Sequence, residues 1–294
     1  MRAAVIEEGA LKIAVRADPV PGAGELLIRV HASGVNGADL AQRAGYYPPP
    51  PGAPVDIPGL ECAGETETGE RVMALLPGGG HAELVAVHES HVLPVPENIT
   101  WPEAGGFVET FATAHDALFT QAQLQPGERL LVNGAAGGVG VAAVQLGVEV
   151  GASVTGTVRH HQAEVEALGA DTEASGEYDV ILELVGGPNL GTNLERLAYK
   201  GRIAVIGMGA GSRAEIDFGH LMRKRGRIHG SMLRARSREE KADVIRRLRE
   251  EVLPLFAEGR VCVPVEETFA LERAQDAYER FAAGDKFGKI VIVS

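Results

Sequence analysis

One stretch of the sequence decides the fold: Leu130-Leu131-Val132-Asn133-Gly134-Ala135-Ala136-Gly137-Gly138-Val139-Gly140. Its apolar start predicts a short buried strand, and the small residues after it predict a tight turn into a helix over 138–150. Small residues let a backbone approach a pyrophosphate, to which the helix N-terminus offers unpaired N–H groups and a positive dipole end. The stretch therefore predicts a dinucleotide site, formed by Ala135, Ala136, Gly137, Gly138, Val139 and Gly140.

The sequence around this turn supports the interpretation. In the G-x-G-x-x-G motif, Ala135 takes the place of the first glycine, and Gly137 and Gly140 take the other two. From about residue 112, apolar runs at 129–133, 153–158, 180–185 and 203–206 alternate with helical patterns at 138–150, 161–168 and 190–198. Such alternation predicts a parallel sheet with helices on both faces, the doubly wound α/β class. A tight turn that binds no ligand is the alternative.

The flanking parts of the chain have a different pattern. Residues 1–98 contain short β-rich runs separated by Gly and Pro, which predicts a compact, mostly antiparallel β domain. Residues 238–256 have the apolar spacing of a long amphipathic helix, and a short strand–helix–strand pattern follows them. We therefore predict a β-rich catalytic domain from 1–111 and 257–294, interrupted by a Rossmann domain over 112–256.

The composition excludes several classes of protein. A formal net charge of −12 in 294 residues opposes non-specific binding to nucleic acid. No run of 18 apolar residues predicts a membrane span, and the acidic start of the chain does not resemble a signal peptide, so we expect a cytoplasmic protein. The two cysteines, Cys62 and Cys262, lie far apart in the sequence. A structural zinc site with four cysteines is therefore excluded.

The end of the second strand of the α/β region indicates which dinucleotide binds. NAD sites place an Asp or Glu about 20 residues after the turn, on the ribose hydroxyls. Here the sequence is Thr157-Val158-Arg159-His160-His161, with no carboxylate between Ser153 and His161. Arg159 is suited to bind the 2′-phosphate of NADPH, and Thr157, His160 and His161 are candidate contacts beside it. We therefore predict a preference for NADPH; the alternative is a solvated basic loop.

Several segments together resemble a known family. They are Gly34-Val35-Asn36-Gly37-Ala38-Asp39, Gly45-Tyr46-Tyr47-Pro48-Pro49-Pro50, Pro58-Gly59-Leu60-Glu61-Cys62-Ala63-Gly64, the turn at 135–140 and Gly288-Lys289-Ile290-Val291. The chain resembles the zinc-independent NADPH:quinone oxidoreductases of the medium-chain dehydrogenase/reductase superfamily, and segments 74–80 and 231–236 resemble its stress-inducible branch. The resemblance implies a GroES-like catalytic domain beside the Rossmann domain, and a homodimer.

The resemblance also implies roles for single residues. Asn36 and Thr113 would lie beside the nicotinamide and its ribose. Tyr47 matches an active-site tyrosine, with a contact to the quinone as the expected role; a proton donor and a structural tyrosine are the alternatives. Zinc-dependent members have Cys at position 36 and His at position 60, where this chain has Asn36 and Leu60. We therefore expect no residue of this chain to bind a metal ion.

Other candidates follow from position in the chain. Gly207 and Met208 come directly after the strand predicted at 203–206, at the edge where an open parallel sheet binds its ligand. Arg234 follows another predicted strand and is a candidate cofactor contact, with surface charge as the alternative. We expect Asp39 and Glu61 to be structural hydrogen-bonding residues, and His81 and His88 to be surface or capping residues.

These expectations combine into one function. We predict hydride transfer from NADPH to a quinone without a metal ion, with the proton coming from solvent or from Tyr47. Reduction of α,β-unsaturated carbonyls, such as an enone or enoyl thioester, is the alternative reaction. A regulatory protein that binds NADPH with little turnover is a second alternative. The expected partners are a small-molecule quinone or enone and a second copy of the chain, with no nucleic acid and no membrane.

Overall fold

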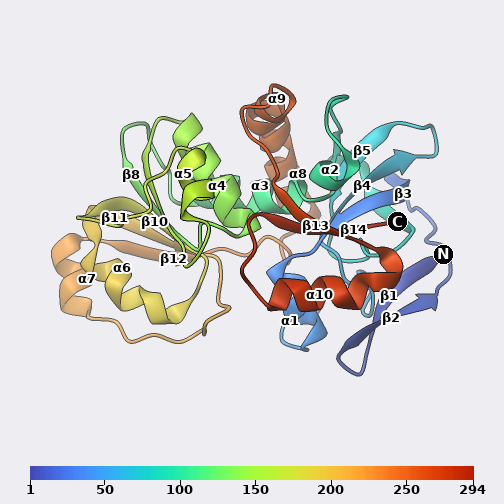
Figure 1. The fold of residues 1–294 in the computed structure, drawn as a ribbon, viewed down its shortest axis with the longest axis horizontal. Coiled ribbons are helices and arrows are strands. Elements are labelled where there is room, and N and C mark those ends of the chain that lie inside the picture. Colours follow the sequence, from blue (N-terminus) through green and yellow to red (C-terminus); the bar gives the residue numbers. More distant parts are fainter. The chain divides into compact units, whose positions relative to one another are not determined.

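The computed structural model describes residues 1–294, which form two units (Figure 1). The first unit comprises Met1–Ala112 and Leu233–Ser294, and the second comprises Thr113–Met232. The second boundary differs from the expected one, because residues 233–256 belong to the first unit. Side-chain contacts explain the difference: Phe256 stacks on Phe107 with ring centroids 4.3 Å apart, and Arg249 donates to the carbonyl of Val92 at 2.6 Å.

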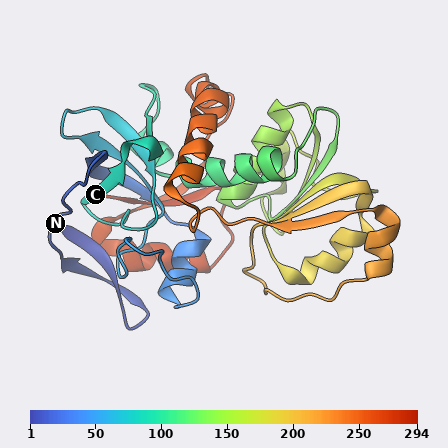
Figure 2. The same ribbon diagram turned by 180° about the vertical axis from the view of Figure 1, so that it is seen from behind.

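A five-stranded parallel sheet forms the centre of the second unit, in the order β12-β11-β10-β8-β9. Its strands are β8 (Arg129–Asn133), β9 (Ser153–Thr157), β10 (Tyr178–Glu183), β11 (Leu197–Val205) and β12 (Arg227–Gly230). The helices α4 (Gly138–Glu149) and α5 (Gln162–Ala167) lie on one side of it, and α6 (Leu190–Glu195) and α7 (Phe218–Lys224) lie on the other (Figures 1 and 2). The predicted doubly wound α/β arrangement is confirmed.

A mostly antiparallel sheet forms the centre of the first unit, in the order β13-β14-β3-β4-β5-β7, with β6 also paired to β3. Its strands are β3 (Glu25–Gly34), β4 (Glu61–Thr66), β5 (Arg71–Leu75), β6 (Leu84–His88), β7 (Val92–Pro94), β13 (Val265–Ala270) and β14 (Lys289–Val293). A separate antiparallel pair is formed by β1 (Arg2–Glu7) and β2 (Ala10–Val15). Strand β14 pairs with β3, with Val291 opposite Gly34, so the two ends of the chain build one sheet.

Short helices connect these strands. Those that lie wholly or partly in the first unit are α1 (Gly37–Arg43), α2 (Trp101–Gly105), α3 (Val108–His115), α8 (Arg238–Arg247), α9 (Leu253–Ala257) and α10 (Ala274–Ala282). Helix α3 contains the boundary between the two units, after Ala112. Two π-helical turns, at Asp116–Gln121 and Leu248–Val252, and three 3₁₀ turns, at Glu89–His91, Gly187–Asn189 and Leu271–Arg273, complete the set. The long helix predicted over 238–256 is divided by the second π turn, because Pro254 at the start of α9 lacks a backbone donor.

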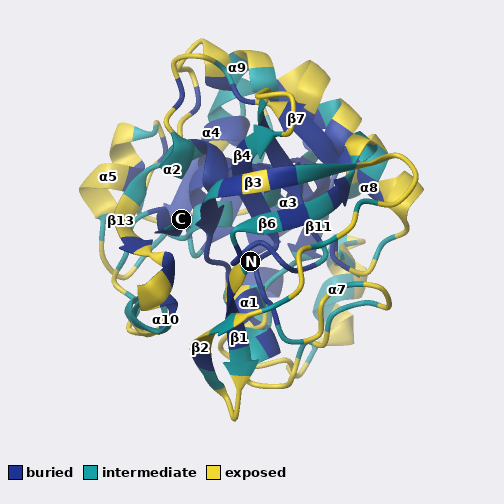
Figure 3. Ribbon diagram, turned by 90° about the vertical axis from the view of Figure 1, so that its right-hand side faces the viewer, coloured by how far each residue is buried: buried dark blue, intermediate teal, exposed yellow.

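The interior of each unit follows from the alternation of its strands. In the first unit, Ile28, Cys62 and Ala74 face one apolar cluster and are wholly buried, and Figure 3 shows the buried stretch of β3. In the second unit, the central strands are buried on both faces, as a parallel sheet between helix layers requires. Cys62 is buried and Cys262 is exposed, and both are free thiols. None of the helices combines the length and the apolar character that crossing a membrane needs.

Candidate functional site

The glycine-rich turn joins β8 to α4 in the second unit. Gly134 adopts a φ of +86°, so the left-handed conformation lies one residue before Ala135 and the alanine is not strained. At Gly140 a Cβ atom would lie 2.3 Å from the carbonyl oxygen of Gly134, so no larger residue fits there. The methyl group of Ala135 is buried against Gly156. A Cβ atom added at Gly156 would lie 2.6 Å from that methyl carbon. The turn therefore accepts alanine at the first position and requires glycine at the last.

The backbone of this turn leaves three donors at the start of α4. The N–H groups of Gly134 and Ala135 donate to the carbonyl of Thr157 at 3.2 and 3.1 Å. Val141 is the first residue of the helix whose N–H bonds back, to the carbonyl of Gly137 at 2.8 Å. The N–H groups of the three helical residues before it, 138–140, therefore have no backbone acceptor. With no acidic residue in the first turn of α4, this cradle fits a pyrophosphate.

A buried polar network supports the turn from beneath. Asn133 donates from Nδ2 to Glu183 Oε2 and to Asn193 Oδ1, both at 2.8 Å, and Thr157 Oγ1 donates to Asn133 Oδ1 at 2.9 Å. The other oxygen of Glu183 accepts two backbone N–H groups, at 2.6 and 2.7 Å. The carboxylate is buried and fully hydrogen-bonded, so it holds the carboxyl ends of β8, β9 and β10 together. The hydroxyl proton of Thr157 is therefore already used in the hydrogen bond to Asn133.

The basic residues expected at the 2′-phosphate follow β9. Arg159 and His160 are exposed, and neither side chain has a hydrogen-bonding or ionic partner within its unit. His161 adopts a φ of +69° and its Nδ1 lies 3.0 Å from Glu164 Oε1, so this ring is engaged by the first turn of α5. Of the three, Arg159 therefore offers the charged group best placed to meet an anion.

Gly207 and Met208 lie at the carboxyl edge of the same sheet. A Cβ at Gly207 would be 2.0 Å from the carbonyl oxygen of Leu184, so glycine lets the chains leaving β10 and β11 approach closely. Met208 is 58% exposed, which is unusual for a large apolar side chain. An apolar surface beside the phosphate cradle suits a flat ring.

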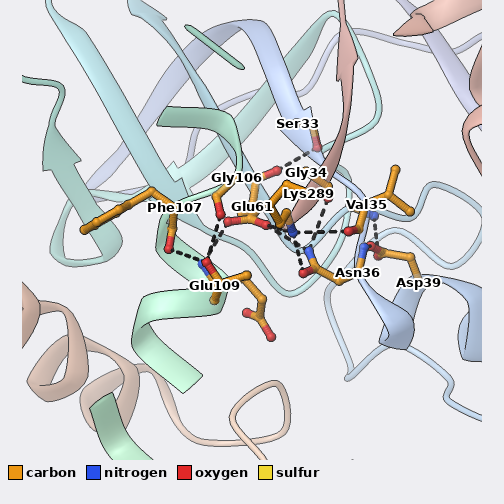
Figure 4. A network of polar contacts seen from close by, with 12 residues as sticks. Ser33, Gly34, Val35, Asn36, Asp39, Glu61, Gly106, Phe107, Glu109 and Lys289 are labelled. Atoms are coloured by element: carbon orange, nitrogen blue, oxygen red, sulfur yellow. Dashed lines mark hydrogen bonds and ion pairs between the residues drawn. The ribbon is translucent and has the colours of Figure 1, made fainter. Parts of the chain in front are cut away.

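In the first unit, three buried side chains form a charged cluster (Figure 4). Lys289 Nζ donates to Glu61 Oε1 and to Asn36 Oδ1, both at 2.7 Å, and Asn36 Nδ2 donates to Glu61 Oε1 at 3.0 Å. They come from the start of β14, the start of β4 and the residue before α1. Both N–H groups of the Asn36 amide are used, the second by the carbonyl of Gly34 at 3.2 Å. The amide group of Asn36 is therefore fixed in orientation.

Asp39 and Glu61 are structural hydrogen-bonding residues, as expected. Asp39 accepts the N–H groups of Asn36 at 2.8 Å and of Gly59 at 3.0 Å, and burial raises its pKa to about 6 despite these bonds. Glu61 Oε2 accepts the N–H of Glu109 at 2.9 Å. Sequence reasoning missed Lys289 as a member of the site, although it stands in the C-terminal segment that carried the family resemblance.

His81 is not at the surface, and this expectation was wrong. Its side chain is wholly buried, with Nδ1 2.9 Å from Ser33 Oγ and Nε2 4.0 Å from Asp39 Oδ2. Burial and the charge of Lys289 lower its pKa to about 3. The grouping of serine, histidine and aspartate is closed to solvent, so it offers no nucleophile. His88 does cap a turn, because its Nδ1 accepts the N–H of Ser90 at 3.2 Å.

Tyr47 is held by Arg234 in the first unit. The guanidinium lies 5.2 Å from the centre of the tyrosine ring and donates to the carbonyl of Tyr47 at 3.0 Å. Its other nitrogens donate to Gln42 Oε1 at 2.6 Å and to the carbonyl of Pro77 at 2.8 Å. Arg234 is 4% exposed, so the alternative of a surface charge is wrong; a cofactor contact stays a prediction. The contacts that the structure shows make Arg234 a positioning residue for Tyr47.

The hydroxyl of Tyr47 keeps its proton at neutral pH. Burial first, and then the negative charge of Glu109, raise the pKa of Tyr47 to about 12. The phenol can therefore donate a hydrogen bond to a carbonyl oxygen. Thr113 lies in α3, where the second unit begins, and its expected contact with the cofactor stays a prediction.

Known proteins resemble the chain in sequence. A family model described as zinc-binding dehydrogenase matches residues 154–292, and one described as alcohol dehydrogenase GroES-like domain matches residues 22–97. The quinone oxidoreductase of Mus musculus is 30% identical, over 94% of this chain and 91% of that protein. The synaptic vesicle membrane protein VAT-1 homolog-like of Homo sapiens is 29% identical, over 96% of this chain and 77% of that protein.

A solved structure resembles it in fold. The quinone oxidoreductase of Thermus thermophilus, whose complex with NADPH is also solved, superposes with a TM-score of 0.89 at 32% identity, over the whole of both chains. One matching family description names zinc, yet no group of three or more His, Cys, Asp or Glu side chains here is arranged to hold a metal ion. With Asn36 and Leu60 at the two positions discussed above, the residues present do not fit a zinc ion.

Proposed function

Because the chain belongs to the quinone oxidoreductase family of the medium-chain dehydrogenase/reductase superfamily, we propose that it reduces quinones with NADPH and without a metal ion. Membership makes it a nicotinamide-dependent oxidoreductase acting on a small molecule. The observation that carries the choice of NADPH is Arg159, which follows β9, is exposed and has no side-chain partner. No carboxylate lies between Ser153 and His161. The choice of a quinone is supported by the two quinone oxidoreductases that the chain resembles.

The residues that would hold the cofactor belong to the second unit. The N–H groups of 138–140 would bind the pyrophosphate, Arg159 the 2′-phosphate, and the edge at Gly207 and Met208 an apolar part of the dinucleotide. Thr157 would act through its backbone, because its carbonyl holds the turn and its hydroxyl is taken by Asn133. When bound, the cofactor supplies the hydride.

The residues that would act on the substrate belong to the first unit. Without a metal ion, a carbonyl oxygen must be polarised by hydrogen-bond donors, and the protonated hydroxyl of Tyr47 is such a donor. Arg234 would keep that hydroxyl in place. Asn36, whose amide is held by Lys289 and Glu61, is the residue of this unit that would lie beside the nicotinamide ribose. A quinone suits this site, because it accepts hydride readily without a Lewis acid.

Steady-state oxidation of NADPH tests the proposal. We expect turnover with 1,4- and 1,2-quinones, higher kcat/KM with NADPH than with NADH, and little turnover with alkenals. Faster reduction of alkenals or enoyl thioesters would favour the alternative reaction. Tight NADPH binding with no turnover on any acceptor would favour a binding protein. Metal analysis of the pure protein is the control, since stoichiometric zinc would overturn the metal-free reaction. The homodimer and the cytoplasmic location stay predictions, of which sedimentation equilibrium tests the first.

A further inference from the structure

The side chain of Glu109 has no partner, although it lies beside the buried cluster of Asn36, Glu61 and Lys289. Its backbone N–H donates to Glu61 Oε2 at 2.9 Å, at the start of α3. Figure 4 shows its carboxyl group extending away from that cluster. No hydrogen bond or ion pair reaches the carboxyl group, and the residue is half-buried. The protein therefore supplies no hydrogen bond that would stabilise the ionised form of this carboxyl group.

The charges around Glu109 favour the protonated form. Burial is the main cause of a pKa well above the usual range, and the nearby carboxyl groups of Glu61 and Asp39 raise it further. The cations Lys289 and Arg234 act in the opposite direction but do not cancel these effects. The carboxyl group of Glu109 therefore keeps its proton to a higher pH than an ordinary glutamate does.

Glu109 is also coupled electrostatically to Tyr47 and to Lys241. When it is ionised, its charge raises the pKa of Tyr47, and it raises the pKa of Lys241 against the lowering effect of burial. Tyr47 itself is a weak acid, with a pKa of about 12. Proton transfer is most efficient when the pKa of the acid is near the working pH, so a carboxyl group is the better donor of the two.

We propose that the carboxyl group of Glu109 is the acid that protonates the reduced substrate, a role that rests on the proposed function. Hydride transfer to a quinone leaves a hydroquinone anion. The O–H bond of Glu109 then breaks, and its proton forms the new O–H bond on the oxygen of that anion. The resulting carboxylate is stabilised by the charges of Lys289, Arg234 and Lys241, and water returns the proton. One hydride and one proton complete the reduction of one quinone.

The test compares Glu109→Gln with wild-type protein. Glutamine keeps the size of the side chain and removes the acidic proton. Glu97→Gln changes an exposed glutamate of the same unit and is the matched control. Infrared spectra of the protein without cofactor, recorded over a pH series, report the C=O stretch of a protonated carboxyl group. We expect a band that disappears at high pH in wild-type protein and in Glu97→Gln, and that is missing from Glu109→Gln.

Kinetics then test the transfer itself. We expect kcat for quinone reduction to fall about 100-fold in Glu109→Gln, within the range for general acid catalysis, with the Kd for NADPH unchanged. Wild-type kcat should decline as pH rises through the pKa of Glu109 and show a solvent deuterium isotope effect, and the variant should lack both. A variant that matches wild type, or an ionised Glu109 at pH 7 in the spectra, overturns the role of Glu109 alone. Wild-type protein that binds NADPH and reduces no acceptor overturns the proposed function as well.

Discussion

Lys289 and Glu61 form an ion pair of 2.7 Å in which both side chains are almost wholly buried. The pair joins the first residue of β14 to the first residue of β4, so it connects the C-terminal segment to the N-terminal part of the same sheet. Asn36 completes the cluster by accepting from Lys289 and donating to Glu61. Each charge is satisfied only while the other two side chains stay in place, which makes the cluster sensitive to any single change.

Lys289→Met should destabilise the first unit. Removing one partner of a buried ion pair leaves an uncompensated charge, which costs about 3–5 kcal/mol. The double variant Lys289→Met, Glu61→Gln removes both charges and should recover part of that loss. Urea unfolding followed by circular dichroism measures the difference, and a double variant less stable than Lys289→Met would contradict the explanation.

Arg159→Ala should weaken NADPH binding and leave NADH binding unchanged. A hydrogen bond to a charged group contributes about 1.5–3 kcal/mol, which corresponds to a Kd roughly 10 to 150 times higher. Isothermal titration calorimetry with both cofactors measures the effect. Arg227→Ala is the control, because Arg227 is exposed at the opposite, amino edge of the sheet, where β12 begins. Equal losses for NADPH and NADH would remove Arg159 from the 2′-phosphate site.

Gly140→Ala should distort the phosphate turn. The added Cβ would lie 2.3 Å from Gly134 O and 2.7 Å from Ala135 Cα, and backbone atoms cannot move away cheaply. We expect a loss of about 1–3 kcal/mol in stability, the range for overpacking, together with weaker binding of both cofactors. Gly191→Ala, in α6 with open space around it, should leave cofactor binding unchanged and should not lower stability. Normal cofactor binding by Gly140→Ala would show that the turn is not the pyrophosphate site.

The sequence made the second unit predictable because its signals are local. The turn at 134–140 and the four apolar runs before and after it depend on neighbouring residues, and they indicated the parallel sheet. Even there, the glycine with the left-handed backbone is Gly134, not a residue of the G-x-G-x-x-G pattern. Glu183 was missed because its partners Asn133 and Asn193 come from other elements, the strand β8 and the helix α6.

The site of the first unit was less predictable because it is assembled from distant segments. Lys289 lies more than 200 residues after its partners in the sequence, so no spacing pattern connects them. Glu109 has no motif at all; only its missing partners and its buried neighbours single it out. The boundary expected at 256 failed for a similar reason, since an amphipathic helix does not show which unit its apolar face will meet.

Arg234→Ala should act on the substrate and not on the cofactor. Loss of the guanidinium removes the bonds that hold the Tyr47 loop, so we expect KM for the quinone to rise about tenfold or more, the loss of one charged hydrogen bond. Tyr47→Phe should also raise KM for the quinone. It should not cause the loss of stability that we expect from the void at position 234 in Arg234→Ala. Stopped-flow fluorescence titration gives the Kd for NADPH of each variant. A marked increase in that Kd for Arg234→Ala, with KM for the quinone unchanged, would restore Arg234 to the cofactor site.

His81→Gln should change how stability depends on pH. The pKa of His81 is about 3 in the folded protein against 6.5 as its ordinary value, so the unfolded chain binds the proton more strongly. Stability from this group is present above pH 6.5 and is lost as pH falls through 3, by about 1.4 kcal/mol per pH unit. Asp39 acts in the opposite direction, because burial raises its pKa to about 6, but it is present in both proteins.

Between pH 4 and 6, the slope of unfolding free energy against pH should therefore be smaller in His81→Gln than in wild type. Equal slopes for the two proteins, measured by urea unfolding at each pH, would mean that His81 is not held neutral in the folded state.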